Sequence, residues 1–166
     1  MGGKTIGLSF NSGFAGNYAR QPDAVIATRA NNGSDNIVFG APVMISGDGV
    51  ANIDDTLTAD TFVGVASSEA KSTLDYSDQN SGGVYVPGSP VSVFQRGSIS
   101  VACPVDSPSR YGAVYVRTIG ATGRNIGDFE AAAVTDENVL ITNAQWGGIK
   151  DGRNIAELVL LTRGNA

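Results

Sequence analysis

The sequence holds few side chains that could perform catalysis. It contains no histidine, which excludes a Ser-His-Asp or Cys-His nucleophile and any metal site that needs a histidine ligand. The one cysteine, Cys103, has the inward parity of a long predicted strand, so we interpret it as a small core residue and not as a reactive thiol. Gly120, Gly123 and Gly127 lack both the spacing of a phosphate-binding loop and its Lys-Ser/Thr pair, and we interpret them as loop glycines.

Clustered carboxylates are the next candidates for a site. Asp48, Asp54, Asp55 and Asp60 follow one another closely, and carboxylate clusters can bind Ca²⁺. Their spacing lacks the alternation of an EF-hand loop, which favours a solvated acidic loop. Two carboxylates could also hydrolyse a glycosidic bond, but nothing in the sequence selects a pair. We therefore expect no metal, no cofactor and no enzymatic activity.

Two aromatic residues leave a binding function open. Trp146, the only tryptophan, and Tyr115 could stack on a sugar, although core packing or a subunit contact is the commoner role of a lone tryptophan. A carbohydrate-binding β module on a virion surface is therefore one alternative, and its glycan binding would depend on Trp146 or Tyr115. A carboxylate-dependent hydrolase that uses Asp54 or Asp55 is another. Neither has a positive signal in the sequence.

The stretch VSVFQRGSISVAC, residues 91–103, is the element around which the other strands are expected to gather. A two-residue turn at Arg96-Gly97 would place valines opposite serines, so one continuous strand fits better. Its odd positions would then share one face, from Val91 to Cys103. At about 3.3 Å per residue such a strand is unusually long, and we expect it to bend at Gly97 and to serve two parts of a curved sheet.

The composition favours an all-β fold. Twenty-two glycines and only 16% charged residues in 166 indicate many short strands and turns, and the length suits one domain with a substantial core. No apolar run approaches the roughly 20 residues of a membrane span, and the N-terminus lacks a hydrophobic signal core. A single cysteine excludes an internal disulfide, so folding in a reducing cytosol is acceptable. We expect a small β-sandwich or β-barrel (tulip-like) body.

Charge is distributed unevenly along the chain. Residues 1–33 carry a net charge of +2, residues 34–80 carry −7, and the remainder is balanced, which gives the total of −5. An acidic body is repelled by nucleic acid and by anionic lipid. We therefore expect neither nucleic acid nor a membrane as a partner.

The chain divides into an extended N-terminal arm, residues 1–33, and a β-rich body, residues 34–166. In the arm, apolar residues are separated by Gly, Ser and Asn, and residues 5–10 alternate like a strand. Residues 24–27 could form a short strand or turn, and residues 30–35 are a polar, flexible joint. Two alternatives stay open for the arm: it folds back on its own body, or it binds another subunit.

The body should contain about eight short strands, typical of a sandwich or barrel. Residues 46–61 are expected to form an acidic loop or ribbon. Pro42 should lie at an edge or bulge because it cannot donate to a ladder. Residues 128–134 and 139–144 can pair through the turn at 135–138, and residues 155–161 form a strongly apolar closing strand.

Several stretches together resemble the capsid cement, or head decoration, proteins of tailed bacteriophages. They follow one another in order over nearly the whole chain: GNYARQPDAVI (16–26), VFGAPV (38–43), FVGVA (62–66), GSPVSV (88–93) with RGSI (96–99), GAVYV (112–116) and AELVL (156–160). The resemblance implies a small β-rich protein on the outer face of an expanded phage head, commonly a trimer, which clamps neighbouring major capsid subunits and stabilises the head. It implies no catalytic residue.

With that role, the arm becomes the expected contact with the capsid or with another subunit. Fixing about fifteen arm residues costs about 15–30 kcal/mol of backbone entropy, whereas burial of five apolar anchors returns about 8–15 kcal/mol. Anchors alone do not suffice, so the hypothesis requires strand addition to a neighbouring sheet edge and several arms tethered through one oligomer. The expected contact residues are Ile6, Leu8, Phe10, Phe14, Tyr18, Arg20, Pro22 and Asp23.

Overall fold

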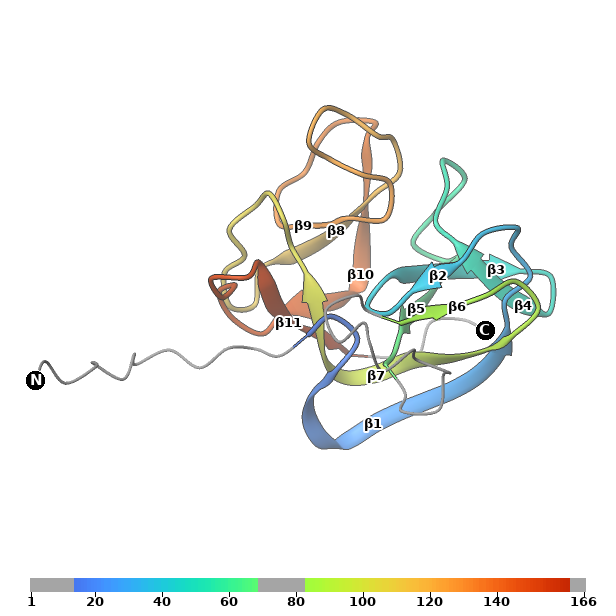
Figure 1. Cartoon of the computed structure of the whole chain (residues 1–166). Coiled ribbons are helices and arrows are strands. Elements are labelled where there is room, and N and C mark those ends of the chain that lie inside the picture. The colour runs from blue at the N-terminus through green and yellow to red at the C-terminus, as the bar shows by residue number, and fades with distance from the viewer. Residues whose placement is uncertain (1–13, 69–82, 162–166) are drawn as a thin grey trace, which may run out of the picture.

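A computed structural model of the chain describes residues 14–68 and 83–161 (Figure 1). These residues contain strands and turns and no helix, which confirms the predicted all-β class. The strands are β1 (Tyr18–Ala30), β2 (Ile37–Val38), β3 (Pro42–Ser46), β4 (Gly49–Asn52), β5 (Phe62–Ala66), β6 (Val84–Tyr85), β7 (Pro90–Ala102), β8 (Ala113–Arg117), β9 (Phe129–Glu130), β10 (Asn138–Trp146) and β11 (Ile155–Leu160).

Strand β7 is the centre of the sheet, as its sequence pattern predicts. It runs unbroken through Arg96-Gly97 and pairs antiparallel with β1, β5 and β11. The main sheet has the order β4-β3-β5-β7-β11-β10-β8-β9, with β1 added to β7, and it curls strongly (Figure 1). Gly97 has a φ of 108°, a conformation that side-chain-bearing residues rarely adopt, so the strand bends where the glycine was expected to allow it.

The bend divides the interior into two hydrophobic cores that share β7. The smaller core contains Val91 and Val93, and it is covered by the two-stranded β2-β6 ribbon. The larger core contains Ile99, Val101 and Cys103, together with residues from strands β8 to β11. The prediction that the odd positions share one face is therefore wrong across the bend, because an irregular register near Arg96 resets the alternation.

The neighbouring strands follow from local sequence. β3 and β4 form a hairpin in which Ser46 pairs with Gly49, so the first part of the expected acidic ribbon is indeed a ribbon. Pro42 begins β3, and the β3-β5 register shifts directly after it, between Val43 and Met44, which agrees with the expected edge or bulge. β5 is buried along its whole length because both cores pack against it.

The predicted pairing of residues 128–134 with 139–144 is wrong. β9 pairs with β8, and β10 pairs with β8 and β11, so β8 lies between the two segments. The carboxylate of Asp106 accepts hydrogen bonds from the amides of Ala131 and Ala132, at 2.9 and 3.1 Å. These two amides are therefore directed away from a ladder with β10.

The described part of the expected arm lies on its own body. β1 contributes thirteen residues to the sheet, and it pairs with β7 from Tyr18 opposite Ile99 to Ala30 opposite Pro90. The joint at residues 30–35 is fixed because buried Asn31 donates to the carbonyls of Asp35 and Tyr85. A boundary at residue 33 thus marks no separate unit within the described residues. Residues 1–13 lie outside them.

Candidate functional site

The residues predicted for capsid or subunit contact are distributed along the N-terminal segment. Ile6, Leu8 and Phe10 lie outside the described residues. Phe14 is 56% exposed, and the guanidinium of Arg153 lies 5.5 Å from its ring centroid. Such cation–π contacts are favourable by about 0.5–1 kcal/mol at exposed sites. Phe14 is therefore held at the surface beside the β10-β11 loop.

Residues 16–18 fasten the segment to the end of β7. The amide of Gly16 donates to the carbonyl of Ser100, and the amide of Ser100 donates to the carbonyl of Asn17, both at 2.8 Å. The amide of Ser68 donates to Gly16 at 2.8 Å as well. The described start of the N-terminal segment is thus connected directly to the central strand.

The predicted residues Tyr18, Arg20, Pro22 and Asp23 lie in β1, where the pairing with β7 is irregular. Register shifts occur on both sides of Arg20, and Pro22 cannot donate to a ladder. Asp23 is one of the expected contact residues. Its carboxylate lies 3.3 Å from Arg96 of the same chain, and because both side chains are exposed this pair contributes little.

The backbones of β1 and β7 approach each other closely at Gly97. A Cβ atom at Gly97 would lie 2.3 Å from the carbonyl oxygen of Asp23, far inside van der Waals contact. Gly97 therefore does two things at once, because it bends β7 and it lets β1 cross close above the bend.

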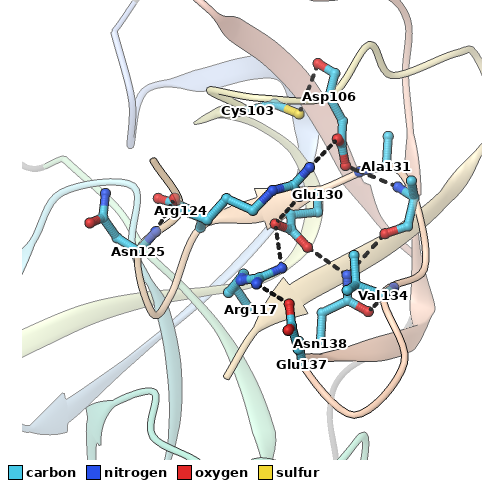
Figure 2. A network of polar contacts seen from close by, with 12 residues as sticks. Cys103, Asp106, Arg117, Arg124, Asn125, Glu130, Ala131, Val134, Glu137 and Asn138 are labelled. Atoms are coloured by element: carbon cyan, nitrogen blue, oxygen red, sulfur yellow. Dashed lines mark hydrogen bonds and ion pairs between the residues drawn. The ribbon is translucent and has the colours of Figure 1, made fainter. Parts of the chain in front are cut away.

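A network of charged side chains, which sequence reasoning missed, connects the loops around β8 and β9 (Figure 2). Arg117 and Glu130 are both 1% exposed, and their charged groups lie 3.3 Å apart. Glu130 also accepts from Arg124 at 2.5 Å and from the side-chain amide, Nδ2, of Asn138 at 2.5 Å. Arg117 donates to Glu137 and, at 2.8 Å, to the carbonyl of Ile119.

Asp106 extends the network to the β7-β8 loop. Its carboxylate lies 3.5 Å from Arg124 and binds the two amides that follow β9. Buried charges are tolerated only when they are paired and hydrogen-bonded, and here each has several partners. We interpret the arrangement as a scaffold, because its charged groups bond to one another and to backbone amides across three loops.

The other candidate residues are also structural. Burial raises the pKa of the Cys103 thiol to about 11, so it is protonated at neutral pH and acts as a core residue. Trp146 is fully buried and packs edge to face against Phe129 at 6.5 Å, so it cannot stack on a sugar. Asp54 accepts from the hydroxyl and amide of Thr56, which lowers the pKa of Asp54 and closes a turn.

The described ranges contain no group of three or more His, Cys, Asp or Glu side chains that could hold a metal ion. They do contain a cleft of about 510 Å³ between the β2-β3 turn and the loop before β9. Its lining is mainly apolar and includes Phe39, Pro42, Ile126 and Phe129, as well as Ala15 of the N-terminal segment. In residues 14–68 and 83–161 there is also no helix long and apolar enough to cross a membrane.

The sequence matches the family described as structural cement protein (E217 gp24/Pam3 gp6) over residues 3–161. The chain belongs to this family of phage structural proteins. No curated protein matches the sequence at a significant level. A chain of the solved structure described as "The capsid of Myoviridae Phage XM1" has the same fold, with a TM-score of 0.72 at 14% identity, over 93% of this chain and 94% of that one.

Family membership accounts for the kind of site that the structure offers. A phage structural cement protein is a component of the virion and associates with capsid proteins. The buried charge network and the two cores therefore serve to hold surface loops and the anchored N-terminal segment in fixed positions. The resemblance stated from the sequence pieces is confirmed.

Proposed function

We propose that the protein binds the outer surface of an expanded phage head, clamps neighbouring major capsid subunits and so stabilises the head. The observation that carries the proposal is the match to the structural cement family over residues 3–161. We further propose that it acts as a homo-oligomer, with three copies as the simplest case, that it is made in the host cytoplasm, and that it has no enzymatic activity and binds neither nucleic acid nor membrane.

The N-terminal segment is the part that we propose to contact the capsid. Within it we assign the contact to residues 1–13, because residues 16–18 are already bonded to β7. Ile6, Leu8 and Phe10 alternate with polar residues, so a strand would present all three on one side. Added to the edge of a capsid sheet, this strand would gain backbone hydrogen bonds and buried apolar contacts together.

The test uses expanded heads that lack the protein, to which purified protein is added before sedimentation. One variant deletes residues 1–13, which leaves every described contact of the body in place. A second variant changes Ile6, Leu8 and Phe10 to Ser. Its matched control changes Thr5, Ser9 and Asn11 to Ala and keeps the three anchors.

We expect both the deletion and the serine variant to bind heads at least about tenfold more weakly, and the control to bind like the unchanged protein. Equal binding by the deletion variant would refute the role of the segment. Failure of the unchanged protein to bind any head, or to raise the temperature at which heads disassemble, would refute the cement function itself.

A further inference from the structure

One end of the molecule, here called the basic end, presents large apolar side chains among positive charges. It is formed by Arg110 and Tyr111 of the β7-β8 loop and by Ile149, Lys150 and Arg153 of the β10-β11 loop. The two loops lie side by side (Figure 1), because the amide of Tyr111 donates to Trp146 at 2.7 Å and Lys150 donates to the carbonyl of Cys103 at 3.1 Å. Ile149 is 80% exposed and Tyr111 73%, the two highest values among the large hydrophobic residues of the described chain.

The exposed tyrosine is held in place at an energetic cost. Tyr111 has a φ of 64°, a left-handed conformation that is unusual for a bulky residue. Hydrogen bonds on either side fix it, from its own amide to Trp146 and from the amide of Gly112 to Ser109 at 2.9 Å. The loop therefore directs an aromatic side chain into solvent, where most of its surface is left uncovered in the monomer.

The residue types of the basic end are those of a protein interface. Tyr and Arg are enriched at interface centres and among the residues that contribute most to binding. The same loops also contain Asp106, whose side chain is only 12% exposed, and Asp151, which accepts from the amide of Arg153 at 2.8 Å. The three basic side chains outnumber these two carboxylates, so an acidic partner would complement this end.

The opposite end of the same chain has the complementary character. Ile45 is 41% exposed, and its amide donates to the carbonyl of Thr61, the neighbour of Asp60, at 2.9 Å. Asp48 follows in the β3-β4 turn and accepts from the side-chain amide of Asn32 at 3.0 Å. Both aspartates are exposed. The sequence contains no Lys or Arg between Arg29 and Lys71. In Figure 1 this acidic end, with β3 and β4, lies across the molecule from the β10-β11 loop.

We propose that copies of this chain associate head to tail, with the basic end of one copy docked on the acidic end of the next. Tyr111 and Ile149 would pack against Ile45 of the neighbour, and Arg110 and Arg153 would face Asp48 and Asp60. An interface between two different surfaces of the same molecule closes into a ring when its rotation permits. The inference deepens the proposed homo-oligomer by naming its interface.

The test is charge reversal at the two ends. A basic-end variant combines Arg110→Glu with Arg153→Glu, and an acidic-end variant combines Asp48→Lys with Asp60→Lys. A third protein carries all four substitutions. The control, Thr122→Glu with Thr135→Glu, places two acidic residues at exposed loop positions away from both ends. Sedimentation equilibrium in 0.15 M NaCl gives the dissociation constant, and circular dichroism checks that each variant is folded.

We expect each two-site variant to raise the dissociation constant of the oligomer at least about tenfold, because like charges then face each other. The four-site variant should return to within about threefold of the unchanged protein, and the control should not differ from it. Association should also weaken as the salt concentration rises.

A four-site variant no better than either two-site variant would overturn the proposal, as would a wild-type chain that stays monomeric at 100 µM. If that monomer still binds heads and the basic-end variant does not, the basic end meets the shell and not a second copy. That result would end the head-to-tail inference and leave the cement function standing.

Discussion

The buried pair Arg117–Glu130 predicts a large and specific loss of stability when one partner is removed. Glu130 is 1% exposed and accepts hydrogen bonds from Arg117, Arg124 and Asn138. The substitution Glu130→Ala leaves the guanidinium of Arg117 in the interior with one carboxylate fewer. Removal of one partner of a buried ion pair costs about 3–5 kcal/mol. For a chain of this length that lowers the melting temperature by about 6–20 °C.

Two further variants separate the charge effect from lost packing. Glu137 contacts the same arginine but is 40% exposed, so Glu137→Ala should cost only about 1 kcal/mol. The double variant Arg117→Met/Glu130→Leu removes both buried charges and keeps apolar volume, and it should be more stable than Glu130→Ala alone. Urea unfolding followed by circular dichroism measures all three. A loss below about 1 kcal/mol for Glu130→Ala, or a double variant no more stable than Glu130→Ala, would refute the reasoning.

Two other predictions concern the central strand and the residue that follows it. Gly97→Ala should destabilise the protein by about 2–4 kcal/mol and increase hydrogen exchange in β1, because a Cβ there meets the carbonyl of Asp23 at 2.3 Å in addition to the cost of a positive φ. The control Gly88→Ala, at a φ of 78° with open space around it, should cost only about 1–2 kcal/mol, and equal costs for the two variants would contradict this explanation. Burial raises the pKa of Cys103 from 9.0 to about 11, so the stability that the protonated thiol contributes is complete below pH 9 and is lost as the pH rises through about 11. Urea unfolding between pH 8 and 11.5 should therefore show a fall in the free energy of unfolding that is smaller in Cys103→Ala. An equal fall in both proteins would refute this explanation.

The central strand could be predicted because its information is local. Alternation on both sides of Gly97 and the poor pairing of a hairpin at that point are visible in thirteen residues. The two separate cores could not be predicted in the same way. The alternation of inward and outward side chains in β7 resets near Arg96, where β1 crosses β7. β1 is far from this point in sequence. A periodicity argument carries no information about such a crossing.

The charge network depends on still more distant contacts. Arg117 and Glu130 are thirteen residues apart, and only the pairing of β8 with β9, which places Glu130 opposite Tyr115, brings them together. Sequence alone gives no reason to distinguish them from surface charges. The pairing of β9 was mispredicted for a related reason, since the amides that follow it are taken by Asp106, twenty-five residues from Ala131.

The sharing of one strand by two interiors has a mechanical consequence. β7 contributes side chains to both cores and is bonded to the N-terminal segment at Ser100. Tension on that segment therefore reaches β7 through the Ser100 bonds and through the β1-β7 ladder. The force is delivered to the strand that both cores share, so a disturbance of β7 would be felt in both of them.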